Sequence, residues 1–302
     1  MRIIALIGAS ASGKSALGLA LAREFDIEIF SLDSLSIYKY IDIASAKPSI
    51  DELNEVTHYA IDVLEPNQKC SVMTFWNLLD KAIQTSKQKG KRALLIVGGS
   101  SFYLKSMVDG LSPMPQLNSQ IVTHAQSIDK PFEFLQRIDS AYCAGISPND
   151  TYRIQRALEI YFATQSTPSA YFTTHKKITM PALENLCIFS LQMPRETLRE
   201  RIFKRTRQMI DKGLIDEIKF LSQRYPLDSQ IFKAIGIKET LHYLNLTPKE
   251  QDTNALCEQI ATHTAQLAKR QTTFNRTQFP TAKSLPLDSL TQELRHILQT
   301  IL

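Results

Sequence analysis

The sequence predicts an α/β protein, with a parallel sheet core, helices on both faces and an inserted helical subdomain. Three observations predict this class. Short apolar runs alternate with helical patterns through the first 110 residues, an order typical of parallel sheets. A glycine-rich turn joins the first strand to the first helix. Mostly helical patterning then begins at residue 111, and sheet-like sequence returns at residue 186.

The elements of the first segment follow from the spacing of their apolar residues. Continuous apolar runs predict buried strands, and apolar residues on one face of a 3.6-residue period predict helices. In chain order we expect a strand at residues 3–7, a helix at 16–25, a strand at 27–32, an ordered loop with a short helix at 34–48, a strand at 58–63, a helix at 71–88 and a strand at 92–97. Ligands bind beyond the carboxyl ends of such strands.

The inserted segment begins at a break that contains two prolines, residues 112–115. Its strongest helices are expected at residues 132–138 and 152–163, the second after a turn that supplies an N-cap. After it we expect a fifth strand at residues 186–191 and helices at 197–224 with a break at Gly213, at 231–243 and at 255–276. The chain is therefore divided into a core, residues 1–110 and 180–302, and an inserted helical subdomain, residues 111–179.

The composition narrows the class of protein. At 302 residues with 43% hydrophobic content, the chain can bury a large core. No apolar run approaches the roughly 18 to 20 residues that span a bilayer, and the first strand leaves no room for a signal peptide, so we expect a cytoplasmic protein. The four cysteines lie far apart, which disfavours a zinc site or a disulfide framework. A net charge of +5 permits a polyanionic partner without requiring one.

The turn after the first strand carries the strongest motif. It fits G-x-x-x-x-G-K-[ST], the P-loop that binds phosphate, and consists of Gly8, Ala9, Ser10, Ala11, Ser12, Gly13, Lys14 and Ser15. Backbone N–H groups would surround an anion at the helix N-terminus, with Lys14 on outer phosphate oxygens and Ser15 on Mg²⁺. The core is therefore P-loop NTPase-like. The loop alone leaves open whether the phosphates belong to ATP, GTP or another molecule.

Two polar residues are expected at neighbouring strand ends. Asp33 follows the second strand and Ser100 the fourth, and the carboxyl ends of parallel strands lie at one edge of the sheet. Both side chains should face the phosphate loop. Three roles are open for Asp33: a ligand of Mg²⁺ through water, a general base, or a cap of the next helix.

Two arginines form a candidate diphosphate contact in a later helix. Arg201 and Arg205 lie four residues apart and share one helical face. Paired guanidinium groups suit phosphoryl oxygens. Salt bridges to neighbours such as Glu200 or Glu217 are the alternative role.

A second basic segment near the C-terminal end combines charge with an aromatic ring. Lys269, Arg270 and Gln271 precede Phe274, and such a mixture suits RNA. A helix end packed on the core explains the same pattern nearly as well. Charge alone does not distinguish the two.

These residues belong to an ordered set of segments that resembles the bacterial tRNA dimethylallyltransferases, also called isopentenyl-tRNA transferases, over nearly the full chain. Besides the phosphate loop, the segments are residues 33–38, 43–48, 58–62, 97–103, 149–159, 213–217, 234–236 and 269–271. Many families share the phosphate loop, whereas this ordered set is highly specific.

The resemblance implies transfer of a prenyl group from dimethylallyl diphosphate to N6 of the tRNA adenosine at position 37, just 3′ of the anticodon. The departing diphosphate would be stabilised by Lys14, by the loop amides, by Mg²⁺ on Ser15, and by the Arg201 and Arg205 pair. Asp33 takes the position of the general base, and Ser100 lies next to the reacting centre. The implied catalytic residues are Asp33, Ser100 and Lys14. No membrane and no obligate protein partner are expected.

The resemblance also implies a set of tRNA contacts. The target base must leave its stack to reach a cleft, so base flipping is expected. The implied tRNA-binding residues are Asp33, Ser34, Leu35, Ser36, Ser100, Arg153, Gln155, Arg156, Lys269, Arg270 and Gln271. For Arg153 and Arg156 a solvated helix face is the alternative.

Several positions depart from the pattern of the family, and two rival functions stay open. The departures are Ala44 and Ser45 ahead of Lys47, Thr57, Ser100 in place of Thr, and Ser147. A small-molecule kinase would use the same loop for ATP and Asp33 to activate an acceptor hydroxyl. A nucleotide-gated RNA-binding protein would bind RNA without turnover. The basic segments at residues 155–156 and 269–271 have no obvious role in a small-molecule kinase.

Overall fold

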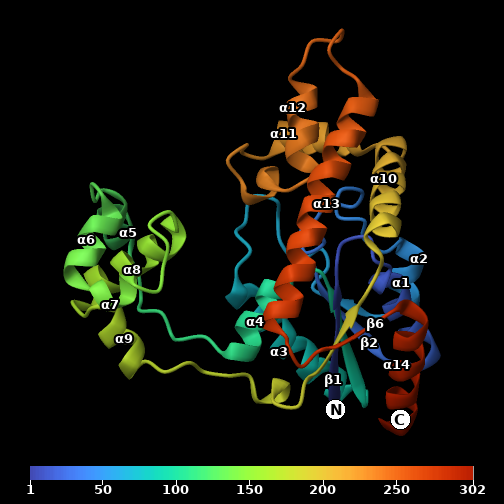
Figure 1. Cartoon of the computed structure of the whole chain (residues 1–302), viewed down its shortest axis with the longest axis horizontal. Helices are drawn as coiled ribbons and strands as arrows, with labels where there is room; N and C mark the ends of the chain where they lie inside the picture. The colour runs from blue at the N-terminus through green and yellow to red at the C-terminus, as the bar shows by residue number, and fades with distance from the viewer. Residues whose placement is uncertain (302) are drawn as a thin grey trace. The chain divides into compact units, whose positions relative to one another are not determined.

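The computed structural model describes residues 1–301, and the chain divides into two compact units. The first comprises Met1–Ser106 and Pro181–Leu302, and the second Met107–Met180. Figure 1 shows the order of the elements along the chain. Among the described residues, none of the helices is long and apolar enough to cross a membrane.

The first unit is built on a parallel sheet of six strands in the order β3-β2-β4-β1-β5-β6. The strands are β1 Arg2–Gly8, β2 Glu28–Leu32, β3 His58–Tyr59, β4 Ala93–Gly98, β5 Cys187–Leu191 and β6 Lys283–Leu285. Because every pair is parallel, the loops after β1, β2 and β4 leave from one edge of the sheet. This edge is where ligands bind in such folds.

Eleven helical segments complete the described part of this unit. They are α1 Lys14–Glu24, α2 Ile50–Glu55, α3 Val72–Gln88, α4 Ser101–Asp109, η1 Pro181–Leu183, α10 Arg195–Asp211, α11 Leu214–Arg224, η2 Gln230–Lys233, α12 Ile237–Leu244, α13 Thr253–Gln278 and α14 Leu287–Ile301. Helix α4 begins in the first unit and ends in the second. Helices α10 and α13 run side by side (Figure 1).

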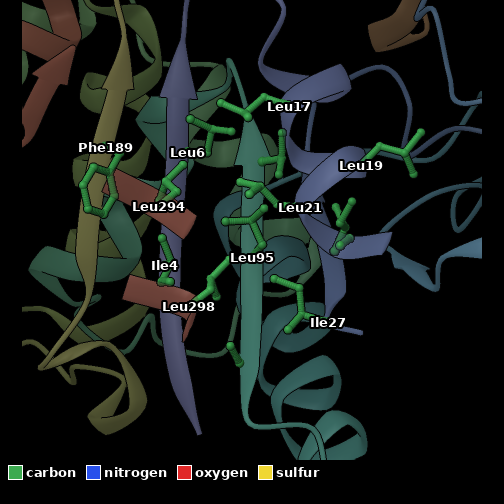
Figure 2. Close-up of a cluster of buried hydrophobic side chains, with 14 of the residues drawn as sticks. Ile4, Leu6, Leu17, Leu19, Leu21, Ile27, Leu95, Phe189, Leu294 and Leu298 are labelled. Atoms are coloured by element: carbon green, nitrogen blue, oxygen red, sulfur yellow. The ribbon is translucent and has the colours of Figure 1, made fainter. Parts of the chain in front are cut away.

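The core of the first unit lies on both faces of the sheet. On one face, leucines of α1 and α14 pack over β1, β4 and β5, as Figure 2 shows for Leu21, Leu294 and Leu298. Side chains alternate along a strand, so Phe30 points to the other face, where its ring meets Phe75 of α3 edge-on with 6.3 Å between the centroids. The apolar runs of the strands are thus buried on both sides, as parallel sheets require.

The predicted strands and helices of the core are found with shifted ends, and three local predictions are wrong. The third strand was expected at residues 58–63 but has two residues, since Ala60 and Asp62 take positive φ angles of 62° and 54° and cannot continue a strand. Residues 34–48 contain turns and no helix. The helix expected at residues 231–243 is broken before Gly236, whose φ is +91°.

Two C-terminal elements were absent from the prediction. Strand β6 is three residues long and pairs with β5 as the outermost strand on that side of the sheet. Helix α14 buries Leu290, Leu294 and Leu298 against the sheet. Their spacing of four residues is a helical signal that the sequence does carry.

The second unit has its own small core. Its helices are α5 Ser119–Gln126, α6 Pro131–Ile138, α7 Ser140–Cys143, α8 Thr151–Thr164 and α9 Pro168–Thr174. Helix α8 supplies Ile154, Ala157 and Leu158 to the cluster, which also contains Leu135 of α6. Asp139 accepts hydrogen bonds from the Ser169 backbone and hydroxyl and from Tyr142 N, tying α7 to α9.

Candidate active site

The phosphate loop closes tightly around its own lysine. Gly13 caps α1 with φ +99°, a left-handed conformation that glycine adopts without strain. This turn places Lys14 at the start of α1, where its Nζ donates to Ala9 O at 3.0 Å. The side chain is buried. The ammonium group is therefore enclosed by the loop that should hold the anion.

The charge on Lys14 depends on pH near neutrality. Burial lowers the pKa of Lys14 to about 8, and Arg205 acts in the same direction while Asp33 opposes it. Burial likewise lowers the pKa of Arg205, and Asp33 again opposes the shift. Two cations and one carboxylate thus influence one another at the edge of the sheet. The surplus positive charge favours an anionic ligand.

Asp33 and Ser100 meet at the ends of β2 and β4. Asp33 Oδ1 accepts from Leu35 N at 2.8 Å and from Ser36 N at 3.2 Å, so one oxygen caps the following turn. Ser100 Oγ accepts from Ser34 N at 3.1 Å. Within residues 1–301, no hydrogen bond reaches Asp33 Oδ2. The carboxylate is fixed through one oxygen while the other is left for a ligand.

Two cavities share Asp33 and Arg205 in their walls. The smaller, about 220 Å³, is lined by Lys14 and Ser15 on one side and by residues 45–48 on another. The larger, about 620 Å³, is lined by Ser100, Arg270 and by apolar residues of α10 and α13. Ser10 and Ser45 also belong to both walls. The site therefore has a cationic compartment and a wider one, with Asp33 between them.

The structure separates the two arginines of α10. Arg205 lines both cavities. Arg201 instead donates from Nη1 to Ser12 O at 3.2 Å and approaches Met193 Sδ at 3.7 Å. A methyl group on Gly13 would lie 3.2 Å from this nitrogen. Arg201 thus holds the outside of the phosphate loop, whereas Arg205 faces the space inside the site.

The three residues of the basic segment on α13 make different contacts. Lys269 lines a groove of about 900 Å³ between α10 and α13, and Arg270 lines the larger cavity of the site. Gln271 Oε1 accepts from Ser10 N at 2.8 Å, and its Nε2 donates to Gly99 O at 2.9 Å. Gln271 also lines the larger cavity, so Arg270 and Gln271 share one wall of the site while Lys269 lies in the groove.

Sequence reasoning missed the residue that shapes the loop after β2, residues 34–48. Glu217 accepts from three successive backbone amides, Asp42 N at 2.8 Å, Ile43 N at 2.7 Å and Ala44 N at 2.9 Å. From the sequence, Glu217 lies in one of the segments that resemble the family and is only an alternative salt-bridge partner of an arginine. Its spacing in the sequence gives no hint of this loop.

Lys47 is a second residue whose position explains the same loop. Its Nζ donates to Tyr38 O at 2.7 Å, to Asp42 Oδ1 at 2.7 Å and to Asp62 Oδ1 at 2.5 Å. Only 4% of the side chain is exposed. All three partners belong to the protein, so this ammonium group orders the loop after β2.

The predicted RNA-facing residues of the second unit lie on α8. Arg153 has an exposed side chain whose Nε is 3.5 Å from Asp150 Oδ2. Gln155 Nε2 donates to Glu159 Oε1 at 3.1 Å, and Arg156 Nη1 to Glu159 Oε2 at 2.6 Å. Glu159 is buried. Gln155 and Arg156 therefore satisfy a buried carboxylate, while Arg153 extends into solvent.

The residues that depart from the family pattern make hydrogen bonds to backbone groups. Ser45 Oγ donates to Ile41 O at 2.5 Å, Thr57 O accepts from Ile29 N at 3.0 Å, and Ser147 Oγ accepts from Asn149 N at 3.2 Å. Ser100 keeps the hydroxyl that holds Ser34 N. In each case the contact needs only a backbone group or a hydroxyl.

Comparisons with known proteins give one consistent answer. A family model described as IPP transferase matches residues 36–278. The tRNA dimethylallyltransferase of Wolinella succinogenes is 46% identical over 300 residues and 98% of each chain, and that of a Helicobacter pylori strain is 49% identical over 92% of this chain and 88% of its own. These proteins match essentially the whole chain.

Solved structures agree with the sequence matches. A eukaryotic dimethylallyltransferase acting on tRNA superposes with a TM-score of 0.80 at 25% identity, covering 95% of this chain and 74% of its own. The tRNA isopentenylpyrophosphate transferase of Bacillus halodurans gives a TM-score of 0.69 at 28% identity, covering 99% and 96%. The P-loop-like parallel sheet with helices is therefore shared with these enzymes.

Proposed function

This chain belongs to the IPP transferase family and transfers a dimethylallyl group to tRNA, and we propose that dimethylallyl diphosphate is the donor and N6 of the adenosine at position 37 the acceptor. The solved relative described as acting on tRNA supports the same macromolecular substrate. The cytoplasm is the proposed location of the reaction.

One observation carries the assignment of the site: the two cavities share Asp33 and Arg205. The smaller cavity contains Lys14 and Ser15 of the phosphate loop, which suits a diphosphate. The larger is wide enough for a base and has an apolar wall. We assign the donor diphosphate to the first and the flipped adenine to the second, so that the reacting atoms meet beside Asp33.

The transfer breaks one bond and forms another. The C–O bond between the dimethylallyl carbon and the diphosphate breaks, and the electron pair leaves with the diphosphate oxygen. Lys14, which is buried, and Arg205, which is half-buried, stabilise that negative charge. The adenine N6 forms the new C–N bond, and its proton goes to Asp33, whose free Oδ2 faces the ligand in this proposal. Ser100 holds the turn beside Asp33.

Mg²⁺ is proposed as the cofactor on the chemistry of the residues present. The Ser15 hydroxyl and the Asp33 carboxylate line the same small cavity as Lys14, and hydroxyl and carboxylate oxygens suit this ion together with phosphate oxygens and water. When bound, the ion would neutralise charge on the diphosphate. Ser15 is the proposed direct ligand, with Asp33 reaching the ion through water.

The tRNA contacts are proposed to come from both units. The turn beside the larger cavity consists of Asp33, Ser34, Leu35 and Ser36, and Ser100 bonds to it. The flipped base would be read at this turn. Arg270 lines that cavity, and Lys269 and Arg153 expose their charges. Gln155 and Arg156 contribute by ordering α8 through Glu159.

A labelled-transfer assay tests the proposal. Purified protein with Mg²⁺ should transfer label from dimethylallyl diphosphate to an anticodon stem-loop with adenosine at the acceptor position, and a stem-loop with guanosine there should stay unlabelled. ATP in place of the donor should give no phosphorylated product. Absence of prenyl transfer together with ATP-dependent phosphorylation of a metabolite would establish the kinase alternative.

The role of Asp33 is tested by Asp33→Asn. The amide still accepts from Leu35 N and Ser36 N through one oxygen but cannot take the proton. We expect the single-turnover rate to fall by about 10² to 10⁴ with RNA affinity largely kept. Normal turnover by this variant would leave Asp33 as a cap of the turn only.

A further inference from the structure

Gln271 connects two loops that belong to different parts of the active site. Its Oε1 accepts from Ser10 N at 2.8 Å and from Ser10 Oγ at 3.2 Å, both in the phosphate loop. Its Nε2 donates to Gly99 O at 2.9 Å, in the turn after β4. The neutral amide of Gln271 thus bonds to the phosphate loop and to the turn after β4 at the same time. Because two donors face the oxygen and one acceptor faces the nitrogen, the partners themselves fix the orientation of the amide.

The turn after β4 is shaped to receive this amide. A methyl group on Gly99 would lie 2.7 Å from Gln271 Nε2 and 3.5 Å from both Gly8 O and Lys14 Nζ. A side chain at residue 99 would therefore force the amide away from the turn. The glycine permits a close approach between α13, the phosphate loop and the turn after β4.

The connection continues to the residues that handle the acceptor. Next to Gly99, Ser100 Oγ accepts from Ser34 N, directly after Asp33. The path Ser10, Gln271, Gly99, Ser100, Ser34 therefore runs from the phosphate loop to the turn of the proposed general base. A shift of either loop along this path would change the distance between a bound diphosphate and the Asp33 carboxylate.

We propose that Gln271 is a positioning residue for prenyl transfer, which braces the phosphate loop against the turn after β4 and so holds the donor in register with Asp33. The inference rests on the proposed function. Gln271 also lines the larger cavity, and the proposal gives it this positioning role in place of the RNA contact that the resemblance implies. An ionised glutamate would place a second acceptor oxygen against Gly99 O and add negative charge beside the anion site, so it cannot satisfy all three partners as the amide does.

The first test is Gln271→Met, which keeps the length of the side chain and removes both hydrogen-bonding groups. With saturating RNA and donor, we expect the single-turnover rate to fall by about 10²-fold, the size of effect that small misplacements of reacting groups produce. The dissociation constant for the stem-loop should stay within about twofold of the original protein. Gln278→Met, an exposed change at the end of the same helix, is the matched control.

Gln271→Glu supplies a signature that a general loss of packing does not give. When protonated, the carboxyl group can donate to Gly99 O and accept from Ser10 N as the amide does. The rate of this variant, taken relative to the original protein at each pH, should rise as the pH falls toward the pKa of the new carboxyl group. If the rate of Gln271→Glu relative to the original protein did not change with pH and was itself normal, Gln271 would have no positioning role in the reaction.

Hydrogen exchange at the Ser10 amide tests the brace apart from catalysis. The Ser10 N–H should be protected in the original protein and in Gln278→Met and should exchange faster in Gln271→Met. Unprotected Ser10 in the original protein would overturn the inference, as would a Gln271→Met variant that binds RNA poorly but reacts normally at saturation. If the original protein transferred no prenyl group, the proposed function would fail, whereas the exchange result would still decide whether the brace exists.

Discussion

The two loops that line the site hold their shapes in different ways. The phosphate loop, residues 8–15, is shaped from within by the positive φ of Gly13 and the bond from Lys14 to Ala9 O, and Gln271 and Arg201 add bonds from outside. The loop after β2, residues 34–48, contains its own Lys47 but depends on a distant side chain for three of its amides. Glu217, which bonds three of its amides, lies 173 to 175 residues further along the chain.

This difference separates function from stability. In the phosphate loop, the buried ammonium group of Lys14 is available for a ligand. Because this group is desolvated without a carboxylate in direct contact, it lowers the stability of the ligand-free protein. In the loop after β2 the charged side chains, Glu217 from a distant helix and Lys47 from the loop itself, bond to the protein's own backbone and neighbours. Substitutions in the first should affect chemistry, and substitutions at the second should affect folding.

The largest effect is expected from Lys14→Gln. Loss of the cation should lower kcat/KM for transfer by about 10² to 10³, as for other groups that stabilise charge in the transition state. The free energy of unfolding at neutral pH should be kept or raised, because a desolvated ammonium group is removed. Transfer assays and urea denaturation measure the two quantities. A stability loss in proportion to the activity loss would contradict the separation.

Glu217→Gln should show the opposite balance. The amide keeps one acceptor oxygen and turns an NH₂ group toward a backbone N–H, so at least one of the three bonds is lost. Since hydrogen bonds to charged groups contribute about 1.5 to 3 kcal/mol, we expect the free energy of unfolding to fall by about 3 kcal/mol in a urea titration. Asp216→Asn, an exposed change one residue away, is the control and should leave the midpoint unchanged.

The same contrast explains what the sequence could predict. The phosphate loop, the strand before it and the helix after it were recognisable because a local pattern dictates local geometry. Asp33 and Ser100 followed from the rule that parallel strands end at one edge. The roles of Glu217 and Gln271 could not be derived, because their partners are backbone groups far away in the chain. No residue type marks a backbone amide that needs a partner.

The errors in the prediction of the fold have local physical causes. A run such as residues 58–63 is apolar enough for a strand, yet Ala60 and Asp62 adopt left-handed conformations, which residue type did not reveal. The loop after β2 is long enough for a short helix, but its N–H groups at residues 42–44 donate to the Glu217 carboxylate and not to carbonyl oxygens of a preceding helical turn. Helix α14 was different, since the spacing of Leu290, Leu294 and Leu298 was visible.

The pH dependence of donor binding sharpens the role of Lys14. The charged ammonium group is the form that binds diphosphate, and its pKa in the ligand-free protein is about 8. Affinity should therefore be constant below this pH and fall above it, by up to about tenfold at one pH unit higher. Calorimetric titration with inorganic pyrophosphate across this range measures the effect. Lys14→Gln corrects for ionisation of pyrophosphate itself, and an identical pH profile in that variant would exclude Lys14 as the cause.

The smallest predicted effect concerns helix α8 of the second unit. This helix carries an exposed arginine, Arg153, and an arginine paired with a buried carboxylate, Arg156. Arg153→Ala should lower the slope of log affinity for the stem-loop against log salt by about 0.7 to 0.9, the value for one phosphate contact. Arg156→Ala should leave that slope nearly unchanged and destabilise the unit instead, because the buried Glu159 loses its charged partner. Binding across a salt series and thermal denaturation separate the two outcomes. If both variants changed the slope equally, Arg156 would have to leave Glu159 to reach the RNA.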